Sequence, residues 1–330
     1  MPDNDPLSST ELVDMEKKRM NAITQSSGFS GPTKDVARSW RTLIQDALPR
    51  LVLAPTLVCA LLFIYGFIAW TGVLSLTHSK LLPVYDFAGL DQYFLLFENE
   101  RWWQALRNLA IFGGLFILVC MVVGLVLAVL LDQKIRAEGA IRSIYLYPMA
   151  LSFIVTGTAW KWILNPEFGL EKLMHDLGFT TFQFDWLINP DYSIYTVVIA
   201  GVWQSSGFVM ALFLAGLRGI DSSIIKAAQV DGASLVTIYR RIIIPSLRPV
   251  FFSCFMILAH IAIKSFDLVA ALTGGGPGFS SDLPATFMYT FTFTRSQIGL
   301  GAASAMMMMM IVVAVIVPFM YSEVRRSRHV

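Results

Sequence analysis

The chain has 330 residues, of which 55% are hydrophobic and 15% are charged, with a formal net charge of +2 and a mean hydropathy of +0.62. These values exclude an ordinary soluble domain and indicate an integral membrane protein. The small net charge gives no reason to expect a nucleic-acid partner. The three cysteines lie inside apolar runs without metal-ligand spacing, so we expect neither a metal site nor a redox role.

The first 46 residues are polar and mix acidic with basic side chains. They contain no apolar stretch of the kind that a signal peptide needs. We therefore expect residues 1–46 to form a flexible cytoplasmic tail, followed by a transmembrane domain over residues 47–330.

A helix needs about 20 apolar residues to cross the ~30 Å hydrocarbon layer of a membrane. The sequence predicts an all-α membrane protein with six transmembrane helices, because six windows meet this requirement. The windows are residues 50–72, 105–131, 143–163, 194–217, 250–272 and 298–321. Six crossings would place both termini on the same side.

The basic residues indicate which side that is. Of the 25 Lys and Arg residues, seven lie before residue 51, three in residues 132–142, five in residues 218–249 and three at the C-terminus, eighteen in all. The loops between the other ends of the windows are acidic. By the positive-inside rule, both termini and the loop 218–249 are predicted to be cytoplasmic.

The loop 218–249 interrupts the apolar runs with a polar, helix-forming sequence. Asp221 or Ser222 can cap a first helix, and Gly232 can end it in a left-handed conformation. Ala233 then begins a second helix, which Pro245 is expected to stop. Small residues at the bend would let another protein approach closely, but an amphipathic helix in the headgroup layer fits the spacing equally well.

The same segment resembles the EAA loop of binding-protein-dependent ABC importer permeases, in which EAA is followed by a Gly-containing DGA triplet and later by I-x-L-P. The matching positions are Ala227, Ala228, Asp231, Gly232, Ala233, Ile242, Ile244 and Pro245. Three further segments resemble the carbohydrate-type subclass of those permeases: 89–97 (GLDQYFLLF), 156–170 (TGTAWKWILNPEFGL) and 266–278 (FDLVAALTGGGPG). The resemblance extends over nearly everything after residue 48.

The resemblance implies a type I ABC importer permease fold whose loop is a coupling helix seated on a cytoplasmic ABC ATPase dimer. The implied docking residues are Lys226, Ala227, Ala228, Asp231, Gly232, Ala233 and Pro245. It also implies a second, different permease subunit, a periplasmic solute-binding protein that delivers a sugar, and a location in the bacterial inner membrane.

The chain itself is expected to be no enzyme and to bind no cofactor. It lacks the G-x-x-x-x-G-K-[ST] phosphate loop, so a partner ATPase would bind ATP and Mg²⁺. Two departures from the family pattern stand out. Lys226 replaces the glutamate of EAA, and the outer loop 73–103 is too short for the extra periplasmic domain of maltose-type subunits.

The fifth window carries His260, Lys264 and Asp267, which at about 100° per residue share one helical stripe about 60° wide. Ionisable groups inside a membrane must pair or face water. One interpretation is that Lys264 pairs with Asp267 within the helix. The other is that the stripe lines a solute path, and the two are compatible. Candidate path residues are Trp160, Trp203, Gln204, His260, Lys264 and Asp267.

A different class of function is an ion- or proton-coupled secondary carrier that uses His260, Lys264 and Asp267 as a relay. Such carriers usually contain inverted repeats, and none is visible in the sequence. In the importer interpretation, the segment from Thr273 to Asp282 is a candidate contact for the solute-binding protein.

Overall fold

The computed structural model describes residues 40–133 and 135–327. Within this part of the chain the regular structure is helical, apart from one isolated β-bridge between Thr77 and Phe87. The all-α prediction is confirmed for these residues. Most of the tail predicted for residues 1–46 lies outside them, and the first described helix begins at Trp40, before the boundary expected at residue 47.

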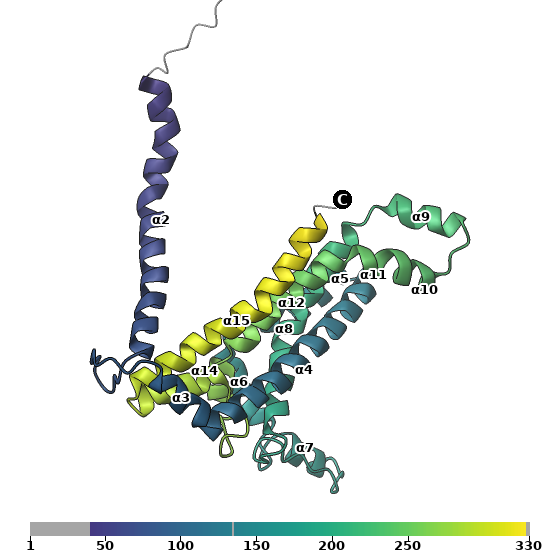
Figure 1. Ribbon diagram of the computed structural model, residues 1–330. Coiled ribbons are helices and arrows are strands. Elements are labelled where there is room, and N and C mark those ends of the chain that lie inside the picture. Colours follow the sequence, from purple (N-terminus) through teal and green to yellow (C-terminus); the bar gives the residue numbers. More distant parts are fainter. Residues whose placement is uncertain (1–39, 134, 328–330) are drawn as a thin grey trace, which may run out of the picture. The chain divides into compact units, whose positions relative to one another are not determined.

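The described helices are labelled in Figure 1. In chain order they are α2 (Trp40–Ser75), α3 (Asp91–Glu98), α4 (Glu100–Leu131), α5 (Glu138–Leu146), the 3₁₀ turn η1 (Tyr147–Ala150), α6 (Phe153–Ile163), α7 (Leu170–Asp176), α8 (Ser193–Arg218), α9 (Ser222–Val230), α10 (Leu235–Ile238), the π turn η2 (Tyr239–Ile243), α11 (Ile244–Ser246), α12 (Arg248–Ile263), α13 (Asp267–Leu272), α14 (Pro284–Tyr289), the π turn η3 (Thr290–Thr294) and α15 (Ile298–Ser327). Residues from Tyr65 onward form one compact unit, and the part of α2 before residue 65 belongs to a separate one.

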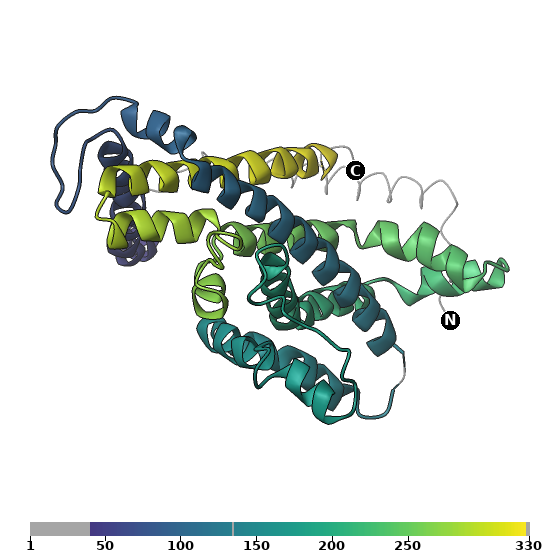
Figure 2. The same ribbon diagram turned by 90° about the horizontal axis from the view of Figure 1, so that it is seen from below.

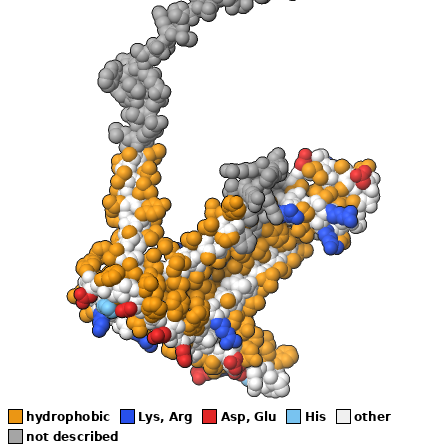
Figure 3. Space-filling view, viewed as in Figure 1, with side chains coloured by type: hydrophobic (Ala, Val, Ile, Leu, Met, Phe, Trp, Pro, Cys, Tyr) orange, Lys and Arg blue, Asp and Glu red, His pale blue; other side chains and the backbone are white. Residues whose placement is uncertain are grey.

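Four described helices are long and apolar enough to cross a membrane singly: Leu53–Ser75, Glu100–Leu131, Ser193–Arg218 and Ile298–Pro318. Two bent pairs bring the number to six if each pair is one crossing: Glu138–Ala150 with Phe153–Ile163, and Leu235–Ser246 with Arg248–Ile263. On the face shown in Figure 3, the middle of the helical bundle is almost entirely hydrophobic and charged side chains gather at its two ends. Length and composition therefore support four to six crossings.

Helix α8 forms the centre of the compact unit and packs most extensively along α4. Helix α8 also approaches α5 closely at Gly207, where an added Cβ atom would lie 1.8 Å from the carbonyl oxygen of Tyr145 in α5. Only glycine lets the two backbones approach to this distance.

A second, smaller core surrounds the N-terminal end of α4. Its buried members come from α3, α4, α14, η3 and α15, and they are Leu96, Trp102, Ala105, Phe287, Phe291, Leu300 and Ala303. Trp102 and Phe287 meet edge to face, with 5.2 Å between ring centroids. This core fixes the N-terminal end of α4 against the last helices of the chain.

The third predicted window, residues 143–163, is not one helix. The chain bends by 100° between η1 and α6, where Pro148 cannot donate a backbone hydrogen bond and Ser152 caps α6 by accepting from the Val155 amide at 3.3 Å. The side chain of Gln204 donates to the freed carbonyl of Leu151 at 2.8 Å. This hydrogen bond gives the Leu151 carbonyl a partner, which the hydrocarbon of a membrane could not provide.

The fifth window, residues 250–272, is also broken, so the prediction of one continuous helix is wrong. Helix α12 ends at Ile263 and α13 begins at Asp267. Lys264 caps the C-terminal end of α12, and Asp267 lies in the first turn of α13. Both charges are placed favourably for the dipoles of these helices, so His260, Lys264 and Asp267 do not share the stripe of a single helix.

The second helix of the loop 218–249 also differs from its prediction at both ends. It begins at Leu235 rather than Ala233, because Ser234 caps it by accepting from the Thr237 amide. It continues past Pro245 to Ser246. The wider π turn over Tyr239–Ile243 lies where the proline ring would otherwise meet the carbonyl of Arg241.

Candidate functional site

Helices α9 and α10 form a hairpin, residues 221–238, which we call the knuckle. In Figures 1 and 2 it extends beyond the end of the helical bundle at which α4 finishes. The carboxylate of Asp221 begins it by accepting from the Ser223 amide at 2.8 Å. This hydrogen bond, together with one to the Ser223 side chain, holds the pKa of Asp221 below its usual value.

The bend of the knuckle is a Schellman turn. Gly232 has φ +79°, its amide donates to the Gln229 carbonyl, and the Ala233 amide donates to the Ala228 carbonyl, both at 3.0 Å. Ser234 then caps α10. The conformation of the knuckle is thus defined by hydrogen bonds between residues close in sequence.

The tip of the knuckle presents apolar side chains to the surroundings. Val230 is 87% exposed, Val236 75% and Leu235 67%. Such clusters on an otherwise polar projection usually mark a contact with another protein or a membrane. We refer to Val230, Leu235 and Val236 as the knuckle tip.

The residues predicted to dock fall into two groups. Lys226, Ala227, Asp231 and Gly232 are exposed. The three others are partly buried, and Ala228 and Ala233 pack against the core of the bundle. The structure therefore brings the exposed group next to the knuckle tip and gives Ala228 and Ala233 a packing role. Docking itself stays a prediction.

Ion pairs join the helix ends beside the knuckle. Arg218 at the end of α8 pairs with Glu138 at 2.7 Å and with Asp132 at 3.8 Å, and Glu138 also lies 3.8 Å from Arg142. These side chains are partly exposed, so their contribution to stability is small. Their effect is to connect the ends of α4, α5 and α8.

The predicted path residues are also divided by burial. Trp203, His260, Lys264 and Asp267 are exposed on the single chain, and Trp160 is partly buried with its ring edge to face against Trp203 at 5.9 Å. Gln204 is buried and bonded to Leu151, so its observed role is to support the broken third span. Among the described ion pairs and side-chain hydrogen bonds, none joins His260, Lys264 or Asp267 to another of the three. The Lys264–Asp267 pair, one of the two interpretations of the sequence, is therefore not formed in the described structure.

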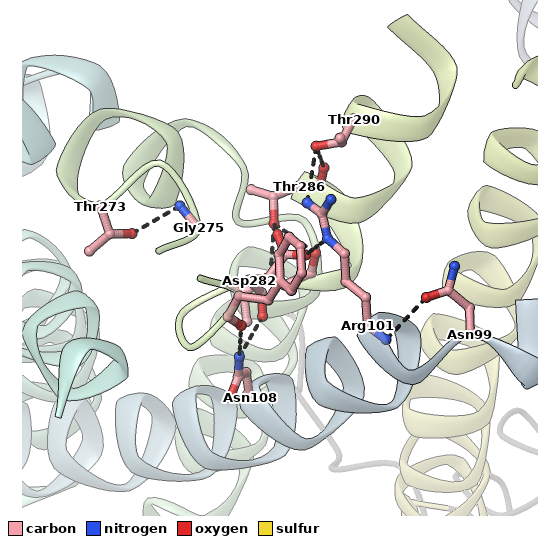
Figure 4. Close-up of polar contacts among 10 residues, drawn as sticks. Asn99, Arg101, Asn108, Thr273, Gly275, Asp282, Thr286 and Thr290 are labelled. Atoms are coloured by element: carbon pink, nitrogen blue, oxygen red, sulfur yellow. Dashed lines mark hydrogen bonds and ion pairs between the residues drawn. The ribbon is translucent and has the colours of Figure 1, made fainter. Parts of the chain in front are cut away.

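A polar cluster that the sequence did not reveal lies at the other end of α4. The Nε atom of Arg101 donates to Asp282 at 2.6 Å, and the two side chains are 12% and 1% exposed. The side-chain amide of Asn108 donates to the Asp282 carbonyl at 2.9 Å. Figure 4 shows both α4 residues directed toward the loop 273–283, which we call the glycine-rich loop.

One signal in the sequence pointed to this cluster. Arg101 and Asp282 both lie in connections between apolar windows that were predicted to be on the same side of the membrane. Their partnership could not be inferred, because they are 181 positions apart.

The knuckle and the glycine-rich loop lie at opposite ends of α4. A cavity of about 250 Å³ between the C-terminal part of α4 and the helix that follows the knuckle is lined by Leu125, Val129, Tyr239 and Ile243. Asn108 and Arg101 hold the glycine-rich loop near the N-terminal end. A helix of 32 residues is roughly 48 Å long, which exceeds the hydrocarbon thickness of a membrane.

In the described part of the chain, no group of three or more His, Cys, Asp or Glu side chains is arranged to hold a metal ion.

Comparison with known proteins gives consistent matches. Residues 137–328 match the family described as "Binding-protein-dependent transport system inner membrane component". The chain is 38% identical to the probable ABC transporter permease protein PH1215 of Pyrococcus horikoshii, over 82% of this chain and 94% of that protein. It is 35% identical to the xylose/arabinose import permease protein XacH of Haloferax volcanii, over 80% and 84%.

Its fold is similar to that of a chain in the crystal structure of a bacterial ABC transporter involved in the import of the acidic polysaccharide alginate. The TM-score is 0.75 at 20% identity, with 87% of this chain and 99% of that chain covered. At this identity the likeness concerns the fold alone.

Proposed function

Because the chain belongs to the family of binding-protein-dependent transport system inner membrane components, we propose that it is a permease subunit of an ATP-driven importer for a sugar or sugar-like solute. The sugar class is supported by the name of the Haloferax volcanii relative and by the sequence segments that resemble carbohydrate-type permeases. Hydrolysis of ATP belongs to a partner ATPase that binds ATP and Mg²⁺.

We propose six crossings of the inner membrane, with both termini and the knuckle on the cytoplasmic side. The two bent helix pairs supply the third and fifth crossings. The positive-inside bias of the basic residues supports this orientation. It places the glycine-rich loop on the outer side, and a bacterial source stays a prediction.

The observation that carries the proposal is the exposed apolar tip of a projecting, well-capped hairpin. A groove on the ATPase dimer would cover Val230, Leu235 and Val236. Lys226 is exposed beside this surface, so the groove should be acidic or neutral at that point rather than basic.

The chain leads directly from the knuckle to the predicted path. Helix α10 continues through η2 and α11 to α12, with a bend of 59° before α12, and α12 ends at Ile263, directly before Lys264. Closure of the ATPase dimer on nucleotide would move the knuckle as a rigid body and tilt α12 between inward-open and outward-open states.

The exposed polar face of the chain supports a second permease subunit. His260, Lys264 and Asp267 are exposed on the single chain, and charged groups at membrane depth need water or a protein partner. A second, different permease subunit would enclose a solute path lined by these residues and by Trp203. A periplasmic solute-binding protein would load that path.

The docking proposal is tested by co-purification with the partner ATPase. Gly232→Val places a branched side chain at φ +79°, in a position with no other atom within 4 Å, so it should abolish association without disturbing the bundle. Gly178→Val is the matched control, because Gly178 has φ +98° and equally open surroundings but lies after α7. Undiminished association of the Gly232→Val chain would refute the docking site.

The solute class is tested with the solute-binding protein that stimulates the assembled transporter. Its affinity for a panel of neutral pentoses, hexoses and disaccharides should identify the sugar, and uptake of that sugar into vesicles should require ATP. The family does not favour the secondary carrier. Uptake driven by a proton gradient without ATP would restore that alternative.

A further inference from the structure

The glycine-rich loop is held by a charged pair that has almost no access to solvent. Arg101 donates to Asp282 through Nε and to Thr290 through Nη2 at 3.2 Å. The other carboxylate oxygen of Asp282 accepts from the hydroxyl of Thr286. Asp282 is thereby tied to α4 and α14, as Figure 4 shows.

The same arginine supports the exposed part of the loop. Its guanidinium carbon lies 4.3 Å from the centroid of the Phe279 ring, and the Phe279 side chain is 46% exposed. The amide of Asn108 also reaches the Phe279 carbonyl at 3.3 Å. The aromatic ring is therefore displayed in a fixed position rather than on a mobile loop.

The interior of the loop is equally well defined. The hydroxyl of Ser281 lies 2.7 Å from the Thr273 hydroxyl and 2.9 Å from the Gly276 carbonyl, and its single proton can be donated to either. Gly275, at φ +89°, is buried against Asp282, whose Oδ1 would lie 3.1 Å from an added Cβ. The loop thus depends on the orientation of Asp282, which depends on Arg101.

We propose that Arg101 is a positioning residue for delivery of the solute: its pair with Asp282 holds the glycine-rich loop in the shape in which Phe279 contacts the solute-binding protein. This inference rests on the proposed function, which places the loop on the outer side. An exposed aromatic ring beside an arginine is typical of residues that contribute most to protein interfaces. A loop ordered before binding also avoids the entropy cost of ordering it at the interface.

The first measurement is hydrogen–deuterium exchange on the full chain in lipid nanodiscs. Arg101→Met should raise exchange in residues 273–283 at least tenfold and leave the knuckle unchanged. Arg295→Met is the matched control, because Arg295 also lies over an aromatic ring, Phe291 at 4.7 Å, but is in none of the described ion pairs. Unchanged exchange in the glycine-rich loop of the Arg101→Met chain would overturn the proposal.

The second measurement is ATPase stimulation of the assembled transporter by its sugar-loaded binding protein. Arg101→Met should raise the half-maximal concentration of binding protein about tenfold, with a change of less than twofold in the maximal rate. Phe279→Ala should raise the half-maximal concentration of binding protein to a similar extent without raising exchange in the glycine-rich loop. The double variant should have a half-maximal concentration no higher than that of either single variant. Arg101→Lys, which keeps the charge, should show a smaller rise in the half-maximal concentration than Arg101→Met.

Other outcomes would separate a failure of the Arg101 proposal from a failure of the proposed function. Additive effects of Arg101→Met and Phe279→Ala, or a fall in maximal rate without a rise in the half-maximal concentration in a transporter that still assembles, would show that Arg101 only stabilises the fold and would overturn the proposal. If Arg101→Met does not assemble, Asp282→Asn removes the charge pair with an isosteric side chain and must give the same shift. Failure of the unaltered transporter to respond to any binding protein would instead refute the proposed function.

Discussion

The knuckle and the glycine-rich loop are both connections between helices, but they are stabilised in opposite ways. The turns and caps of the knuckle use hydrogen bonds between residues at most five positions apart, and its tip is exposed. The glycine-rich loop is joined to α4 by Asp282, and the partners there are 174 and 181 positions away. A locally defined hairpin can move as a unit on a partner, whereas a loop tied to distant helices moves only with the bundle.

The largest effect should follow from breaking the distant contact. Asp282→Ala leaves the largely buried guanidinium of Arg101 without its counter-charge, so the chain should lose about 3–5 kcal/mol of stability. Thermal unfolding in detergent would measure this loss. The double variant Arg101→Met with Asp282→Asn removes both charges and should be more stable than Asp282→Ala, and the reverse order would contradict the ion-pair explanation.

Gln204→Leu should have the next largest effect. It removes the donor to the Leu151 carbonyl at the break in the third span, and an unsatisfied buried acceptor costs about 1–3 kcal/mol. Unfolding would report the loss, while the order of preference among sugars in uptake assays should stay the same. A changed sugar preference would show that Gln204 belongs to the solute path after all.

A local cap should matter less and only locally. Ser234→Ala removes the acceptor for the Thr237 amide, which should cost about 1 kcal/mol and increase exchange in α10 without shifting global unfolding. Thr237→Val is a suitable control, because it removes the neighbouring hydroxyl and keeps the amide. A global loss of stability in the Ser234→Ala chain would mean that the knuckle is not locally defined.

The smallest effect concerns the first cap of the knuckle. Ser223→Pro removes the backbone donor that lowers the pKa of Asp221, so the pKa should rise toward its usual value. Because the folded-state pKa is depressed, the stability from this cap is present above the unfolded-state pKa and is lost as pH falls through the folded-state pKa. Carbon-13 NMR titration of the labelled carboxyl would measure the change, and an unaltered midpoint in the proline variant would contradict it.

The course of the knuckle could be read largely from the sequence. Asp221 or Ser222 was predicted to cap its first helix and Gly232 to end it. Asp221 is the cap, and Gly232 forms the turn after the helix. The prediction failed at Pro245 because a π turn accommodates the ring. Ile238 and Ile243, at the two ends of this turn, are buried in the core, and that burial could not be inferred from the local sequence.

The predicted path residues show the limits of periodicity. The 100° rule placed His260, Lys264 and Asp267 on one stripe, but the chain breaks after Ile263 because Lys264 and Asp267 are better accommodated at two helix ends. The break in the third span likewise depends on Gln204, which is 53 positions away from the carbonyl that it satisfies.

The sequence by itself determined that this is a helical membrane protein, the positions of its apolar segments, the local conformation of the knuckle and the family to which the chain belongs. Hydropathy, caps and glycine turns act over a few residues, so they can be recognised without knowing the fold. Only the tertiary structure decided that Arg101 meets Asp282, that two spans are broken, and that Gln204 donates to the Leu151 carbonyl at one of these breaks. These contacts join charges and backbone groups that become neighbours only after the helices pack.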